Sequence, residues 1–162
     1  MPTKKTNAAR ILDALGIPYE IFTAPVDESD LSAIALAHTL GVPCEQVFKT
    51  LVVRAEGKTE SEIIMTCIPG QAELDLRKSA AASGHKSAAM VHLKEVLPLT
   101  GYVRGGCSPL GARRNYPVYL DESAILWERI FISAGQRGVQ LLLAPDDLVR
   151  AVSAVYADLC KA

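Results

Sequence analysis

Apolar residues recur along this chain at two spacings, one typical of helices and the other of strands. In residues 4–15 they recur at the spacing of one helix face, and Gly16 follows as a stop signal. A second apolar stripe predicts a helix over residues 31–40, capped by Ser29 or Asp30 and ended by Gly41. The first quarter of the chain is therefore expected to contain two amphipathic helices.

Three more helices are predicted further along the chain. Asp75 is placed to begin a short one, and residues 92–97 form another helical turn that Pro98 is expected to stop. Pro145 suits the first turn of the last helix, which is expected to run through Leu148–Cys160.

Runs of β-branched and aliphatic residues predict about seven short strands. The second and third are separated by only a few residues, so they are expected to form a hairpin. Strands often follow one another without a helix between them, which favours an α+β fold with a mixed, largely antiparallel sheet that curls toward a barrel, with flanking helices. The predicted strands are 19–23, 47–55, 63–69, 88–91, 117–120, 129–133 and 139–143.

Composition narrows the class of protein. The chain has 162 residues, of which 49% are hydrophobic and 22% charged, as expected for one globular domain over residues 1–162. No run approaches the roughly 18 apolar residues that span a bilayer, and residues 1–7 do not resemble a signal peptide. A cytoplasmic protein with no membrane partner is expected.

Charge and cysteine spacing exclude several kinds of site. Four well-separated cysteines without a C-x-x-C pair, and only three histidines, argue against a zinc site or a disulfide framework. The net charge of −1 argues against a protein that binds DNA through bulk electrostatics. Neither a metal ion nor another cofactor is expected, because no dinucleotide, P-loop or metalloprotease motif is present.

Residues 101–111 form the most unusual stretch, with four glycines and one proline in eleven positions. Glycine permits positive φ and close approach of the backbone, so a fixed, bent loop is predicted. Such a loop can present backbone N–H groups to an anion or a carbonyl, but an ordinary turn between strands explains it equally simply. Arginines flank the loop, and they are either phosphate contacts or solvated charge.

Two further features carry candidate chemistry. Lys49 lies within an apolar strand beside Thr50, where it either faces water from an edge strand or lines a pocket as a cation. Ser133 and Arg137 lie in a second glycine-bearing turn. These groups bind without an obvious general base, which suits a substrate that carries its own nucleophile. An alternative is a thiolate at Cys107, activated by the loop and Arg104.

Three stretches together resemble the YbaK/ProX family of aminoacyl-tRNA editing proteins, and most closely its branch that deacylates Cys-tRNA(Pro). They are residues 48–53, 100–111 and 132–138, and their order and separation agree with the family over nearly the whole chain. The resemblance implies a compact domain with a mixed, barrel-like sheet. It also implies removal of a wrong amino acid from the 3′ end of tRNA, with prolyl-tRNA synthetase as a partner that helps to deliver the substrate.

The resemblance implies a role for particular residues. Lys49 matches the family's indispensable lysine, and the substrate thiol is expected to attack its own ester and leave as a thiolactone. Backbone donors of Gly105 and Gly106 are expected to hold the ester carbonyl or the terminal adenosine. The pocket is expected to be shaped by Thr50, Gly101, Gly105, Gly106, Ser108, Ser133 and Gly135, and phosphates to be contacted by Arg104, Arg113, Arg114 and Arg137.

Departures from the family leave alternatives open. Residues 23–29 lack the aromatic and histidine side chains associated with cysteine-specific members, so Ala-tRNA(Pro) hydrolysed by water is a second hypothesis. A non-catalytic module that binds tRNA or a synthetase is a third. The protein is expected to be a monomer or a dimer. Cys107 stands where relatives usually have an aliphatic residue, and Gln140 replaces a polar or acidic position.

Overall fold

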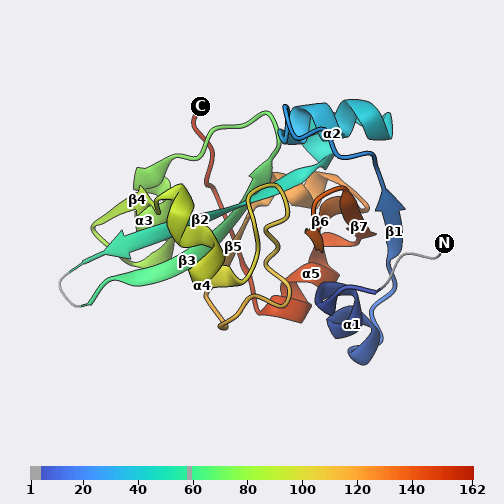
Figure 1. The fold of residues 1–162 in the computed structure, drawn as a ribbon. Coiled ribbons are helices and arrows are strands. Elements are labelled where there is room, and N and C mark those ends of the chain that lie inside the picture. The colour runs from blue at the N-terminus through green and yellow to red at the C-terminus, as the bar shows by residue number, and fades with distance from the viewer. Residues whose placement is uncertain (1–4, 58–59) are drawn as a thin grey trace.

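Two β-sheets meet at an angle and carry short helices on their outer sides (Figure 1). The computed structural model describes residues 5–57 and 60–162. The predicted turn after the second strand includes residues 58 and 59, which lie outside the described part, as do residues 1–4. The strands are β1 (Glu20–Thr23), β2 (Phe48–Glu56), β3 (Glu62–Pro69), β4 (Ser87–Met90), β5 (Val118–Asp121), β6 (Ile130–Gln136), β7 (Val139–Leu143) and β8 (Val155–Ala157).

The larger sheet is mixed and has the strand order β4-β2-β3-β5-β8. Strand β2 pairs antiparallel with both β3 and β4, so the predicted hairpin is confirmed. Strands β5 and β8 add in parallel, with Thr66 opposite Tyr119 and Leu120 opposite Tyr156. The smaller sheet is antiparallel and has the order β1-β7-β6. The predicted α+β fold with a mixed, largely antiparallel arrangement is thus confirmed, although the sheets do not close into a barrel.

Among the described residues, a backbone bridge at the start of β2 joins the two sheets. Val47, just before β2, pairs in parallel with Phe131 of β6. The main apolar core lies between the sheets and includes side chains from both, such as Phe48, Leu120 and Leu141. A smaller apolar cluster lies at the bridge itself, where the rings of Phe22 and Phe131 meet edge to face at 5.4 Å. The angle between the sheets is therefore set by packed side chains as well as by the bridge.

Five α-helices in the described part of the chain, each of eight residues, cover the sheets. Because each is so short, no helix in the described part of the chain could cross a membrane. The predicted stop at Gly16 and caps at Asp75 and Gly41 are confirmed, and the Oδ1 atom of Asp75 accepts from two N–H groups of the first turn. The helices are α1 (Asn7–Ala14), α2 (Ala33–Leu40), α3 (Leu76–Ser83), α4 (Leu93–Thr100) and α5 (Pro145–Val152), with 3₁₀ turns η1 (Cys44–Gln46) and η2 (Glu122–Leu126).

The start of α2 and the end of α4 differ from prediction. Helix α2 is capped by Ser32 and not by Ser29 or Asp30, because Asp27 and Asp30 instead accept N–H groups of the loop before it. Helix α4 continues through Pro98 to Thr100, and the hydroxyl of Tyr116 and the guanidinium of Arg113 donate to carbonyls of its last turn.

The predicted last helix is wrong beyond residue 152. Ser153 adopts the left-handed conformation with φ 54°, and the chain then forms β8 beside β5. The residues of β8 are Val155, Tyr156 and Ala157, of which two have high strand propensity. The parallel pairing partner, which is far away in sequence, therefore decides the conformation of this segment.

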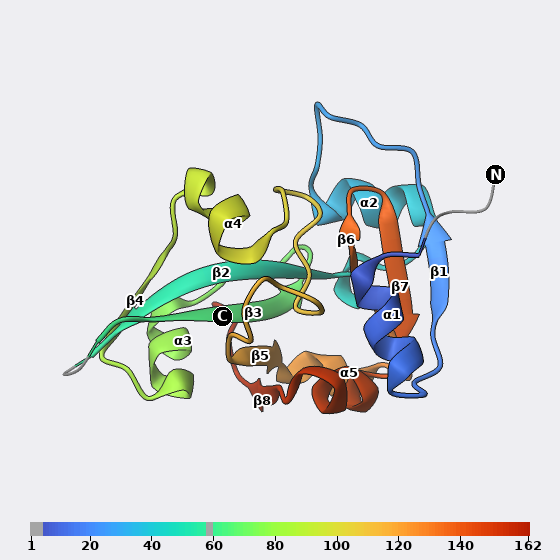
Figure 2. The same ribbon diagram turned by 60° about the horizontal axis from the view of Figure 1, so that its bottom comes forward.

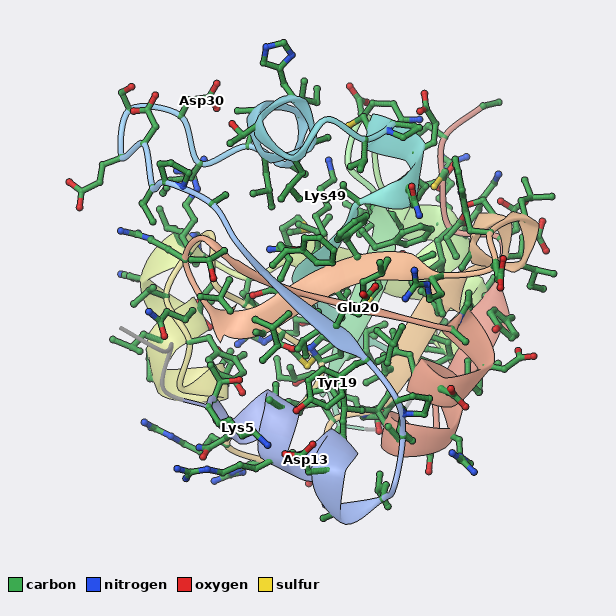
Figure 3. All side chains as sticks on the ribbon, turned by 90° about the vertical axis from the view of Figure 1, so that its right-hand side faces the viewer. Lys5, Asp13, Tyr19, Glu20, Asp30 and Lys49 are labelled. Atoms are coloured by element: carbon green, nitrogen blue, oxygen red, sulfur yellow. The ribbon has the colours of Figure 1, made fainter. Side chains whose placement is uncertain are left out.

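The N-terminal helix is fixed by a small polar cluster that Figure 3 labels. The Lys5 ammonium donates to Asp13 at 2.6 Å, and the Tyr19 hydroxyl donates to the other oxygen of the same carboxylate at 2.8 Å. These two bonds hold the pKa of Asp13 below its usual value. The cluster lies on the opposite side of β1 from α2, and so it is remote from the cavity described next.

Candidate functional site

A cavity of about 480 Å³ lies where β2 passes beneath α2, α4 and residues 101–111, which are called the glycine loop below. Figure 2 shows α4 and α2 on the same side of β2, while the loop runs from the end of α4 across β2. The wall is mostly apolar and contains a few polar groups. The described residues lining it are Leu31, Ala33, Leu36, Val47, Phe48, Lys49, Thr50, Leu51, Val52, Met90, Val91, Leu93, Val96, Arg104, Gly105, Cys107, Ser133 and Gln140. Its size and lining are typical of a small-molecule site.

Lys49 is a partly buried cation on the inner side of α2 (Figure 3). Its Nζ atom donates to the carbonyl oxygen of Gly70 at 3.0 Å. An ammonium group has three donors, so two remain for a ligand in the cavity. The interpretation of Lys49 as a pocket-lining cation, and not a lysine on a solvated edge, therefore agrees with the geometry.

Gly70 holds the carbonyl that Lys49 contacts, and the fold leaves no room for a side chain there. A Cβ atom at this position would lie 2.7 Å from Cβ of Ala33 and 2.9 Å from Sγ of Cys44. Its N–H donates to the Val47 carbonyl at 2.8 Å. Gly70 thus packs against α2 and η1 while its carbonyl orients Lys49. Sequence reasoning missed it, because a carbonyl acceptor has no sequence signature.

The glycine loop and the turn after β6 are packed backbone against backbone. A Cβ atom at Gly106 would lie 3.1 Å from the backbone nitrogen of Arg137. The side chain of Arg137, in the turn after β6, reaches back to the glycine loop. Its Nε atom donates to the Arg104 carbonyl at 2.8 Å. Two of the three recognised stretches therefore form one structural unit at the rim of the cavity.

Tyr102 is clamped between two glycines of this unit. A Cβ atom at Gly135 would lie 2.7 Å from the ring of Tyr102, and one at Gly111 would lie 2.9 Å from its hydroxyl oxygen. The hydroxyl donates to the Leu110 carbonyl at 2.6 Å. Gly135 also has φ 94°, which favours glycine. Gly135 therefore packs against Tyr102 and does not line the cavity itself.

The predicted pocket residues fall into two groups. Lys49, Thr50, Gly105 and Ser133 line the cavity together with Arg104. The remaining four hold the loop in shape. Gly101 ends α4 with φ 82°, and buried Ser108 accepts the N–H of Leu110 through its hydroxyl. Gly106 and Gly135 pack against neighbouring residues, as described above.

The expected role of Gly106 as a backbone donor needs correction. Its N–H already donates to the Val103 carbonyl at 3.0 Å within the loop, and the residue is buried. Gly105 is exposed and lines the cavity, so of the two glycines it is the one placed to meet a ligand. Gly105 also has φ 83°, which makes glycine the favoured residue there.

The four arginines do not form one patch. Arg104 lines the cavity, and Arg137 lies in an adjoining hollow that shares Gly105 with it. Arg113 donates to the Pro98 carbonyl, and Arg114 lines a separate hollow beside α1 and α5. Only Arg104 and Arg137 are therefore close to the cavity.

Cys107 lines the cavity but is poorly suited to act as a thiolate. Burial raises the pKa of its thiol to about 11, and the lowering influence of the Thr100 hydroxyl offsets only part of that effect. The neighbouring Cys67 is fully buried, and its pKa is raised to about 12 for the same reason. The loop and Arg104 do not outweigh desolvation, contrary to the thiolate hypothesis.

If the chain deacylates tRNA as the resemblance implies, replacing Cys107 with serine should change the rate by less than about fivefold. A thiol with a pKa near 11 is almost entirely protonated at pH 7.5, so it supplies no nucleophile. Single-turnover rates measured from pH 6 to pH 9 should show the same profile for wild type and Cys107→Ser. A loss of activity above 100-fold in the variant would restore Cys107 as the nucleophile.

Ionisable side chains other than Lys49 and Arg104 are scarce at the cavity. Among the described lining residues there is no Asp, Glu or His, so none of these can serve as a general base there. Nor do the described residues contain a cluster of three His, Cys, Asp or Glu side chains that could hold a metal ion. The arrangement can bind and polarise a carbonyl or a phosphate through cations and backbone donors.

Comparison with known proteins finds relatives over most of the chain. The model of the aminoacyl-tRNA editing domain matches residues 28–151. EbsC of Enterococcus faecalis, described as a candidate Cys-tRNA(Pro)/Cys-tRNA(Cys) deacylase, is 41% identical over 96% of this chain and 93% of its own.

Two solved structures share the fold over nearly their whole length. The hypothetical protein APE2540 superposes with a TM-score of 0.85 at 23% identity, over 96% of this chain and 99% of its own. A candidate trans-editing enzyme for prolyl-tRNA synthetase superposes with a TM-score of 0.77 at 25% identity, over 99% and 100%.

Proposed function

Because this chain belongs to the family of aminoacyl-tRNA editing domains, we propose that it removes cysteine from mischarged Cys-tRNA(Pro), and also from Cys-tRNA(Cys). The observation that carries the proposal is the composition of the cavity. Lys49 points into a mostly apolar chamber whose described lining contains no general base. Such a site suits a substrate that brings its own nucleophile, and the thiol of a cysteinyl ester is one.

The proposed reaction uses the substrate thiol and the cationic wall. The cysteinyl sulfur attacks its own ester carbonyl carbon, the bond from that carbon to the ribose oxygen breaks, and the thiol proton ends on the ribose hydroxyl. Negative charge develops on the carbonyl oxygen during the attack. Lys49 and the backbone N–H of Gly105 are proposed to stabilise that charge. The products are a thiolactone and free tRNA, and no protein thiol takes part.

The shape of the cavity supports binding of the terminal adenosine as well. Leu31, Leu36, Met90 and Leu93 are apolar lining residues on which a base can pack. Arg104 and Arg137 at the rim are proposed phosphate contacts. Because the net charge is only −1, affinity for tRNA alone is expected to be modest, and prolyl-tRNA synthetase is the proposed partner in delivery.

The experiment compares Cys-tRNA(Pro), Ala-tRNA(Pro) and Pro-tRNA(Pro) as substrates, with and without prolyl-tRNA synthetase. We expect rapid loss of cysteine, with alanine and proline released at least about 100-fold more slowly, because neither side chain can cyclise. Mass spectrometry of the products should detect the thiolactone or its adduct with an added amine. Faster loss of alanine would require water as the nucleophile, and no turnover of any ester would favour a binding module.

A further inference from the structure

Gln140 is a buried amide in the wall of the cavity whose oxygen has no partner. The residue lies on β7 and is 3% exposed, and among the described residues nothing donates to its Oε1 atom. It stands opposite Ser133 on β6, which also lines the cavity. Buried polar side chains are hydrogen-bonded in the great majority of proteins, so an unpaired amide oxygen beside a cavity indicates a missing donor.

Leaving this oxygen unpaired costs stability, which a ligand donor would recover. A buried acceptor without a partner loses its hydration and gains nothing in return. In contrast, Thr50 contacts Cys67, and the Ser133 hydroxyl oxygen accepts the Gly135 N–H at 3.1 Å. Gln140 is thus the lining side chain that is both buried and left with an unpaired acceptor.

We propose that Gln140 accepts a hydrogen bond from the α-ammonium group of the aminoacyl ester and thereby selects esters that carry a free α-amino group. This inference rests on the proposed function, because it names the part of that substrate which Gln140 contacts. An α-ammonium is a strong donor, whereas a thiol is a weak one. No carboxylate is among the described lining residues, and the amide oxygen of Gln140 is the buried lining acceptor that lacks a partner.

Gln140 and Lys49 lie on different sheets. A substrate α-ammonium bound at Gln140 is therefore kept apart from the Lys49 ammonium. Lys49 is on β2 of the five-stranded sheet and is held by Gly70 beneath α2, whereas Gln140 is on β7 of the three-stranded sheet. An ester bound across the junction can direct its carbonyl oxygen to the lysine and its ammonium to the amide. This orientation avoids placing the ammonium beside Lys49.

The test uses a substrate that differs by one group. Cys-tRNA(Pro) is compared with tRNA(Pro) that carries a 3-mercaptopropionyl ester, which keeps the thiol and lacks the α-amino group. We expect the wild-type protein to prefer the cysteinyl ester by about 10- to 100-fold in kcat/KM, the usual effect of a hydrogen bond to a charged group. Gln140→Met, which keeps the side-chain size, should abolish that preference by slowing the cysteinyl ester alone.

A second variant separates an acceptor from a donor. Gln140→Glu keeps an oxygen acceptor and should retain the preference for the cysteinyl ester. If the amide instead donated through Nε2 to the ester oxygen, Gln140→Glu would slow both esters. Equal losses on both esters in Gln140→Met, or a wild type that does not distinguish them, would overturn the proposal.

A binding measurement keeps the inference testable if the proposed function fails. 3′-Alanylamino-3′-deoxyadenosine and its propionylamino counterpart differ only by the α-amino group and cannot be deacylated as esters are. Calorimetry should show about tenfold tighter binding of the first by wild type and equal binding by Gln140→Met. Equal binding of both by wild type would overturn the role of Gln140 whatever the catalytic activity, whereas absence of cysteine release alone would overturn only the proposed function.

Discussion

Replacing Lys49 with alanine is expected to lower single-turnover deacylation of Cys-tRNA(Pro) by about 100- to 1,000-fold, the usual cost of removing a donor that stabilises an oxyanion. The variant loses the ammonium group that lines the cavity. In the wild-type protein, the hydrogen bond to the Gly70 carbonyl fixes the direction of this group. The fold should survive, because Lys49 is only partly buried and its loss leaves one carbonyl for water to reach. Circular dichroism and thermal unfolding of the variant check that point.

Lys94→Ala is the matched control for charge. Lys94 is an exposed cation on α4, close in sequence to the cavity residues Leu93 and Val96, but it does not line the cavity. If Lys49 merely attracted tRNA, the two substitutions would weaken activity by similar factors. High salt would then remove the difference between each variant and the wild-type protein. A folded Lys49→Ala variant with at least one tenth of wild-type activity would contradict the proposed mechanism.

Gly135→Ala should lower the free energy of unfolding by about 3 kcal/mol, combining backbone strain with steric overlap. The residue has φ 94°, and the added methyl group would lie 2.7 Å from the ring of Tyr102. That ring is fixed by its hydrogen bond to Leu110, so it cannot move without disturbing the glycine loop. Urea unfolding followed by fluorescence measures the change.

Gly101→Ala separates the two contributions. Gly101 has φ 82°, yet a Cβ atom there would meet nothing within 4 Å. Only the backbone cost of about 1–2 kcal/mol applies to this variant. If the two variants were equally destabilised, the contact between Gly135 and Tyr102 would contribute nothing, and the packing of the two glycine-bearing segments would need another explanation.

Local patterns were sufficient to predict much of the fold. The hairpin of β2 and β3 follows from two β-branched runs separated by a short turn, and the cap at Asp75 from a side chain that bonds its own helix. Contacts distant in sequence decided the rest. Parallel pairing makes Val155–Ala157 a strand, and donors from Arg113 and Tyr116 support the end of α4 beyond Pro98.

The candidate site was predictable in its chemistry and less so in its geometry. An apolar strand containing Lys49 left a pocket cation and a solvated edge lysine as alternatives, and the glycine-rich stretch indicated a fixed loop. Neither pattern could show that the Gly106 N–H is used inside that loop, or that Gly135 packs on Tyr102. Gln140 was noted in the sequence only as a departure from the family, because an unpaired oxygen is a property of the packed structure.

The bridge between Val47 and Phe131 joins two sheets that otherwise keep separate ladders. The floor of the cavity consists of strands from both, whereas α2, α4 and the loop that form its walls lie outside every ladder. Substitutions at wall positions such as Leu36 or Leu93 can therefore resize the chamber without breaking a strand pair. The width of the chamber and the pairing of its strands thus depend on different residues, so that the size of the side chain it admits could change through substitutions in α2 and α4 alone.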